Sequence, residues 1–179
     1  MNRPSCKVLG VACVLAASVT AHAVEDELRV IPLVRSDNVL VSFELPDAYN
    51  DNVRETISSG LTTTFTYVVD LRQIVPFWVD RTVATAVVSV TNAFDNLTGR
   101  HNLTRTVDGQ IIDSIITEDE EIVKQWLTTF TRLSLCRTSR LAPNHDYYVR
   151  VDARGRPNGS SALGWASAFS GQTRFTFIP

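Results

Sequence analysis

Apolar and polar residues alternate with a period of two in several stretches of the chain. Residues 39–45 carry valine, phenylalanine or leucine at every odd position, and residues 62–71 repeat the pattern in a sequence rich in threonine and aromatic residues. Alternation of this kind predicts antiparallel strands with one buried face. Residues 145–154 and 171–179 alternate in the same way, so strands are predicted in both halves of the chain.

A longer apolar run, residues 75–90, is rich in β-branched residues, and we predict a strand there as well. Residues 95–99 have the composition of a turn, and Asp108 with Gly109 forms the two-residue signature of a type I′ hairpin. These signals predict a three-stranded meander over residues 82–116.

Two short amphipathic helices are predicted between the strands. In the first, Tyr49, Val53 and Ile57 recur at intervals of four, and Gly60 can end the helix in a left-handed conformation. The second helix follows the four acids of residues 118–121 and has an apolar stripe formed by Ile122, Val123, Trp126, Leu127 and Phe130.

The four acids raise the question of a bound cation. Thr117 and Glu120 have the spacing of a capping box, and carboxylates are stabilising at the positive end of a helix dipole. The alternating ligands and the glycine of a calcium-binding EF-hand loop are absent. We therefore interpret the acids as the start of a helix.

Together these elements predict an α+β fold that is mainly antiparallel β. We expect a β-sandwich of about seven to nine strands with two short amphipathic helices on its edge or face. Residues 154–170, rich in glycine, serine and alanine, are predicted to form a long loop before the final strand.

The first 23 residues have the organisation of a secretory signal peptide. Arg3 and Lys7 precede an apolar run, and residues 21–23 form a small-x-small cleavage site. Cys13 lies inside the apolar run, too early for a lipoprotein processing site. We predict that residues 1–23 are cleaved and that residues 24–179 form a single periplasmic or secreted domain without a transmembrane segment.

Charge and cysteine content narrow the functional classes. The formal net charge is −2 for the whole chain and becomes more negative when Arg3 and Lys7 are removed. This negative net charge indicates neither nucleic acid nor an anionic membrane as partner. Cys136 is the only cysteine after residue 23, which excludes an internal disulfide in the predicted mature domain. Its leucine neighbours indicate a buried, unreactive thiol.

No sequence motif for catalysis or for a cofactor is present. His101 and His145 lack partners at metal-ligand spacing, and neither a nucleophile elbow nor a phosphate-binding glycine loop occurs. We therefore predict no catalytic residue, no metal and no cofactor.

One row of charged residues is a candidate ligand site. Arg150, Asp152, Arg154 and Arg156 fall on one face if the strand at 145–154 continues. Arginines arranged in this way could bind an anionic ligand or an acidic partner, although an ordinary solvated sheet face is the alternative. With Trp165 from the following loop, Arg150 and Arg154 are the candidate ligand-binding residues.

Several phrases resemble the DUF4390 family of bacterial secreted domains of unknown function. They are "TTTFTYVVDL", "WVDRTVATAVV", "HNLTRTVDGQI", "VKQWLTTFTRLSL", "HDYYVRVDARGRP" and the closing "TRFTFIP". The resemblance extends from Leu28 to Pro179 and implies a periplasmic envelope protein, with a membrane sensor kinase as a candidate functional partner. It carries over no catalytic residue. Residues 155–164 are rich in glycine and serine here, where the family has prolines and tryptophans.

Two functions follow as hypotheses. The first is a non-enzymatic protein-interaction module of the cell envelope, with an envelope or sensor-kinase protein as partner. The second is a periplasmic small-ligand binding protein that uses the arginine face. An enzyme whose site is assembled from distant carboxylates is the least favoured alternative, and the fold alone does not separate the three.

Overall fold

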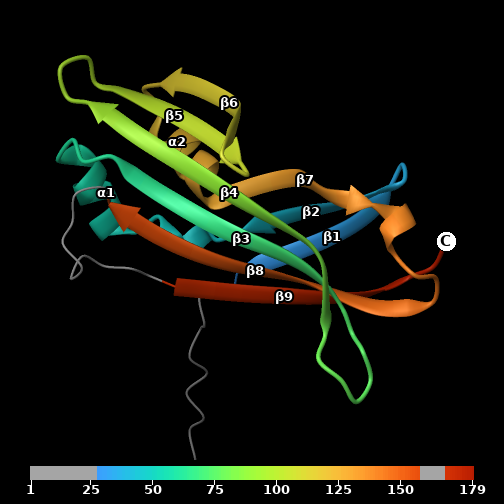
Figure 1. Cartoon of the computed structure of the whole chain (residues 1–179). Coiled ribbons are helices and arrows are strands. Elements are labelled where there is room, and N and C mark those ends of the chain that lie inside the picture. The colour runs from blue at the N-terminus through green and yellow to red at the C-terminus, as the bar shows by residue number, and fades with distance from the viewer. Residues whose placement is uncertain (1–27, 158–167) are drawn as a thin grey trace, which may run out of the picture.

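The computed structural model describes residues 28–157 and 168–179 as two antiparallel sheets packed face to face (Figure 1). The small sheet has the order β1-β2-β7, formed by β1 (Arg29–Arg35), β2 (Asn38–Glu44) and β7 (Thr129–Arg137). The large sheet has the order β6-β5-β4-β3-β8-β9, formed by β6 (Gln110–Thr117), β5 (Arg100–Val107), β4 (Arg81–Asp95), β3 (Thr63–Gln73), β8 (His145–Pro157) and β9 (Ala168–Phe177). The predicted α+β, mainly antiparallel β-sandwich is confirmed.

The core lies between the sheets and is filled by the predicted alternating positions. In β3 every second residue from Thr63 to Leu71 is buried, and the residues between them are half-buried. The ring of Phe43 on β2 lies 4.8 Å from that of Tyr67 and 5.6 Å from that of Phe130, measured between centroids. Aromatic contacts therefore join the two sheets at the centre of the core.

Two α-helices, α1 (Asp51–Ser58) and α2 (Glu120–Thr128), lie at the end of the large sheet where β3 begins and β4 ends (Figure 1). Val53 and Ile57 of α1 and Val123 and Leu127 of α2 are buried. Asn50 caps α1 by accepting a hydrogen bond from a backbone amide at 3.2 Å. The two predicted amphipathic helices are thus present.

The meander of β4, β5 and β6 is also confirmed. Asp108 and Gly109 have φ angles of 49° and 81°, as a type I′ turn requires. The Asp108 carboxylate accepts a hydrogen bond from the Val87 amide at 2.8 Å, which fixes this hairpin against β4.

The predicted strand over residues 75–90 is wrong in its first part. β3 ends at Gln73, and residues 74–80 form the tip of the β3–β4 hairpin. Pro76 cannot donate to a strand ladder, and the Asp80 carboxylate instead accepts a hydrogen bond from the Val75 amide at 3.3 Å. Apolar composition alone did not reveal this break.

The capping box of Thr117 and Glu120 is wrong as well. Asp119 caps α2 by accepting a hydrogen bond from the Glu121 amide at 2.9 Å, and the Thr117 hydroxyl accepts one from the Asp119 amide at 3.0 Å. The side chain of Glu120 is therefore free to point toward α1.

The predicted apolar stripe of α2 is wrong at its two outer positions. α2 ends at Thr128, and Phe130 is buried in β7, opposite Phe43 of β2. Ile122 is exposed. The helix and the strand follow each other without a loop, so the helical spacing ran on into the strand.

The predicted loop over residues 154–170 is too long, because β8 continues to Pro157 and β9 begins at Ala168. The predicted signal peptide and Trp165 lie outside the described residues. The arginine row was predicted on the condition that the strand at 145–154 continues, and β8 does continue, to Pro157.

The two sheets approach most closely where β1 meets β9. The Thr173 hydroxyl donates to the Val30 carbonyl oxygen at 2.6 Å. A Cβ atom at Gly171 would clash with the carbonyl oxygen of Leu28, so this approach of two backbones requires glycine.

Candidate functional site

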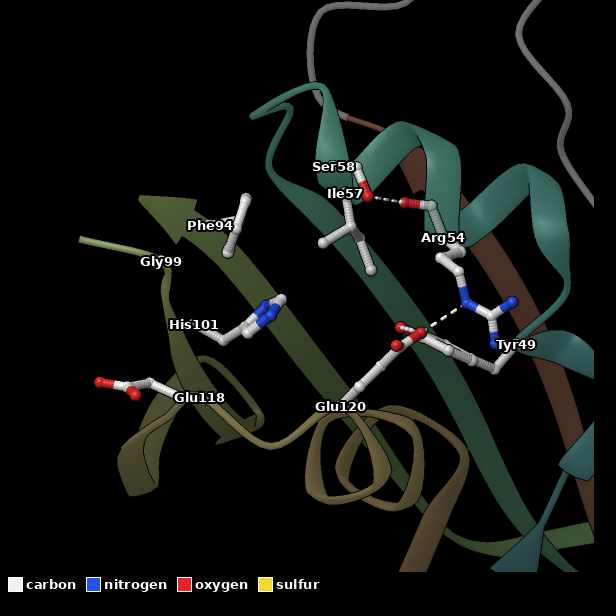
Figure 2. A pocket seen from close by; sticks show the side chains of 9 residues that line it. All are labelled: Tyr49, Arg54, Ile57, Ser58, Phe94, Gly99, His101, Glu118 and Glu120. Carbon is white, nitrogen blue, oxygen red and sulfur yellow. Dashed lines mark hydrogen bonds and ion pairs between the residues drawn. The ribbon is translucent and has the colours of Figure 1, made fainter. Parts of the chain in front are cut away.

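A cavity of about 290 Å³ lies where α1, α2 and the β4–β5 hairpin converge (Figure 2). Its lining comes from elements distant in sequence and includes the polar or charged side chains of Tyr49, Arg54, His101, Glu118 and Glu120, together with the ring of Phe94. The cavity is therefore a product of the tertiary fold.

Glu120 binds two residues across the cavity. The Arg54 Nε donates to its Oε1 at 2.5 Å, and the Tyr49 hydroxyl donates to the same oxygen at 3.2 Å. The hydrogen bond from Arg54 lowers the pKa of the Glu120 carboxyl. Burial, reinforced by the nearby Glu120 charge, raises the pKa of Tyr49 to about 12. Glu120 thus stays ionised and ties the first turn of α2 to α1.

His101 forms the opposite wall and is buried. Its ring centroid lies 4.5 Å from that of Phe94, and its Nδ1 lies 3.3 Å from the Oδ1 of the fully buried Asn92. Burial lowers the pKa of the His101 imidazole, against a smaller opposing effect of Glu120. In the tautomer whose Nδ1–H donates to this Oδ1, the neutral ring keeps Nε2 as an acceptor.

Sequence analysis did not find this cavity. His101 was considered only as a metal ligand, and Glu120 only as one of four possible cation ligands and as part of a helix cap. The bond from Arg54 spans 66 residues, and no local pattern signals such a contact.

The predicted arginine site lies on the outer face of β8. Arg150, Arg154 and Phe169 line a second cavity, of about 310 Å³. Arg150 donates to the Asp152 Oδ1 through Nε at 3.2 Å and Nη2 at 3.0 Å, so a carboxylate already faces this guanidinium. Trp165, the third predicted residue, lies outside the described part of the chain.

Comparison with known proteins places the chain in a family. The sequence profile of DUF4390, a domain of unknown function, matches residues 27–158. The chain belongs to the DUF4390 family. The matched residues include β1 to β8 and both helices, whereas β9 follows them. No curated protein and no solved structure matches this DUF4390 chain.

The DUF4390 domain has an open strand edge at β6. Within the described residues β6 pairs with β5 only, and Ile111, Ile112 and Ile116 are 70%, 52% and 68% exposed. A register shift sets Ile112 in a bulge and leaves residues 113–117 in regular pairing with β5. An apolar edge of this kind is a template for an added strand.

Other chemistry in the described part of this DUF4390 domain is sparse. No group of three or more His, Cys, Asp or Glu side chains there could hold a metal ion. No helix within residues 28–157 and 168–179 has the length and apolar character needed to cross a membrane. Cys136 is a buried free thiol, and burial raises its pKa, which disfavours the reactive thiolate.

Proposed function

We propose that this DUF4390 domain is a non-enzymatic protein-interaction module of the bacterial cell envelope that binds an extended segment of a partner protein along β6. The observation that carries the proposal is the open β6 edge with its exposed isoleucines. In strand addition the backbone hydrogen bonds supply affinity and the alternating side chains supply specificity. The signal-peptide pattern of residues 1–23 supports the envelope location.

Apart from the bulge at Ile112, β6 has little of the usual protection of an edge strand. It is eight residues long and contains no proline or lysine, the residues that commonly block edge-to-edge pairing. Its one charged residue, Asp113, lies opposite Arg105 and accepts a hydrogen bond from the Ser114 amide at 2.9 Å. By contrast, β1 contains Pro32 and lies against β9.

The partner segment is expected to be extended and rich in β-branched residues. Ile111 and Ile116 lie opposite Thr106 and Asn102 of β5 and present apolar surface beside the edge. A membrane sensor kinase is a candidate source of this segment, and only the family resemblance supports this candidate.

Native mass spectrometry of the protein purified gently from its own host tests the proposal. The wild-type protein should retain a protein partner, and Ile111→Lys with Ile116→Lys should release it. Ile31→Lys, at a 63% exposed position of β1, is the matched control and should retain the partner. In the complex, the amides of residues 110–117 should gain protection from hydrogen exchange. An equal loss in both variants, or a bare wild-type protein, would refute strand addition at β6.

A second candidate function, binding of a small anion, is supported by the arginine cavity. Its volume of about 310 Å³ is at the low end for small-molecule sites, and guanidinium groups suit carboxylate or phosphate. Titration calorimetry with inorganic phosphate and with succinate should detect binding that Arg150→Gln with Arg154→Gln abolishes, whereas Arg81→Gln preserves it. Unchanged affinity in the double variant would exclude this site.

A further inference from the structure

The β3–β4 hairpin ends in an exposed apolar tip. Phe77, Trp78 and Val79 are 106%, 81% and 78% exposed, and residues 74–79 carry no charged side chain. Figure 1 shows this tip projecting beyond the body of the sandwich, away from β6. Large adjacent apolar side chains held in water mark an interaction site.

The conformation of the tip is held from its base. The Trp78 amide donates to the Val75 carbonyl oxygen at 3.2 Å, and the Ile74 amide donates to the Asp146 carbonyl oxygen at 2.9 Å. The Asp80 carboxylate accepts hydrogen bonds from the Val75 amide and, at 3.1 Å, from the Tyr148 hydroxyl. The acid nearest the tip is therefore bound to the hairpin base and the adjacent β8.

Phe77 has a left-handed backbone, with φ of 64°. This region is strained for a bulky side chain, and such strain clusters at functional sites. The Phe77 ring is fully exposed in this turn. The tip therefore keeps its two aromatic residues available to a partner.

Although the formal net charge of the whole chain is −2, arginines gather locally behind the apolar tip. Arg72 and Arg81 flank it in sequence, and Arg174 of β9 lies opposite Tyr148, which itself lies opposite Arg72. Arg140 donates to the carbonyl oxygen of Val83 in β4, at 2.5 Å. Three acids, Asp70, Asp80 and Asp146, lie nearby and accept hydrogen bonds from hydroxyl groups at 2.5, 3.1 and 2.6 Å. The four arginines therefore outnumber the acids by one charge. Aromatic residues in front of basic ones match the depth profile of a membrane interface.

We propose that the hairpin tip inserts into the interfacial region of a lipid bilayer that contains anionic phospholipid, with Phe77 and Trp78 below the headgroups and Arg72 and Arg81 among them. A hairpin that extends about three residues beyond its last strand pair can reach roughly 10 Å, which matches the depth of interfacial insertion. A convex finger suits a bilayer, which needs no complementary groove. Because the tip and β6 lie apart, lipid and a protein partner can bind together.

Vesicle flotation of the mature protein, residues 24–179, tests the proposal. The wild-type protein should float with vesicles of phosphatidylethanolamine and phosphatidylglycerol, and more weakly with phosphatidylcholine alone. Phe77→Ser with Trp78→Ser should reduce partitioning by about tenfold or more, because two aromatic side chains lose their burial. Ile111→Ser with Ile116→Ser is the matched control, since it removes apolar surface of similar exposure at β6, and it should float like wild type.

Fluorescence separates insertion from adsorption. On binding, Trp78 emission should shift to the blue and be quenched by brominated lipid. The Trp78→Phe variant should float like wild type but lack the blue shift that Trp78 contributes. Val79→Asp is a second tip variant and should also reduce flotation, with unfolding curves of all variants matching wild type.

Three outcomes would overturn the proposal. They are a wild-type protein that stays with the soluble fraction, tip variants that float like wild type, and equal binding to neutral and anionic vesicles. The loss of a protein partner from the tip variants, with flotation unchanged, would assign the tip to a protein instead.

Discussion

The guanidinium carbon of Arg105 lies 4.1 Å from the ring centroid of Trp126. The same side chain donates hydrogen bonds through Nη2 to the carbonyl oxygens of Trp126 at 2.8 Å and Thr129 at 2.7 Å. Arg105 of β5 therefore satisfies carbonyl groups where α2 ends and β7 begins. Burial lowers the pKa of the guanidinium, which remains charged at neutral pH.

Replacement of Arg105 should destabilise the domain strongly. Arg105→Ala leaves two carbonyl groups without their donor and removes the cation–π contact, so we expect a loss of about 2–4 kcal/mol in the free energy of unfolding. Urea denaturation of residues 24–179 measures this loss. Arg100→Ala breaks an exposed ion pair with Glu118 and should cost less than about 1 kcal/mol. Equal effects of the two substitutions would contradict the structural role of Arg105.

Gly171→Ala should push β1 away from β9. The new methyl group would meet the backbone carbonyl of Leu28, so one strand must shift, at an expected cost of roughly 1–3 kcal/mol. Thermal and urea unfolding measure the change. Ser170→Ala, at the exposed neighbouring position, should stay within about 0.5 kcal/mol of wild type. A fully stable Gly171→Ala variant would show that the two sheets are less closely apposed.

Stability should fall on mild acidification because of His101. Its pKa is lowered by burial, so below the unfolded pKa of about 6.5 the unfolded chain binds a proton that the folded chain does not. The free energy of unfolding should therefore decrease as pH falls through this range, until folded His101 is protonated too. Urea midpoints measured between about pH 8 and 5 should show a shallower decline for His101→Gln. The same decline in this variant and in wild type would rule out His101 as its source.

Cys136 should react slowly in the folded protein. The thiol is buried and its pKa is raised, so both access and thiolate formation are limited. We expect labelling by a disulfide reagent to be roughly hundredfold slower in buffer than in denaturing urea. Comparable rates under the two conditions would indicate that β7 opens readily.

The strands that alternation predicted are those whose two faces differ in environment. In β3 and β8 one face is buried and the other is half-buried or exposed, so the period of two is visible. β6 is exposed along most of its length and was predicted from the Asp108–Gly109 turn signal instead. In β1 only Val30 is fully buried, and no alternation results. β7 was missed because it follows α2 directly and Phe130 continues the helical spacing.

The candidate sites divide in the same way. Alternation places Arg150 and Arg154 on one face, and the structure does bring them together. The bond between Arg54 and Glu120 joins two helices across 66 residues, and Glu120 also fitted a local capping pattern. Because the sequence around Glu120 matches a local capping pattern, nothing in it indicated that this side chain binds a distant residue.

The contact between β1 and β9 affects the order in which the fold can be completed. Thr173 and Val30 are 143 residues apart in sequence, and contacts of such separation form late and slowly. During translation, β1 and β2 leave the ribosome long before β9 has been synthesised. In a nascent chain, β1 of the N-terminal hairpin therefore lacks its neighbour β9 until synthesis has passed residue 177.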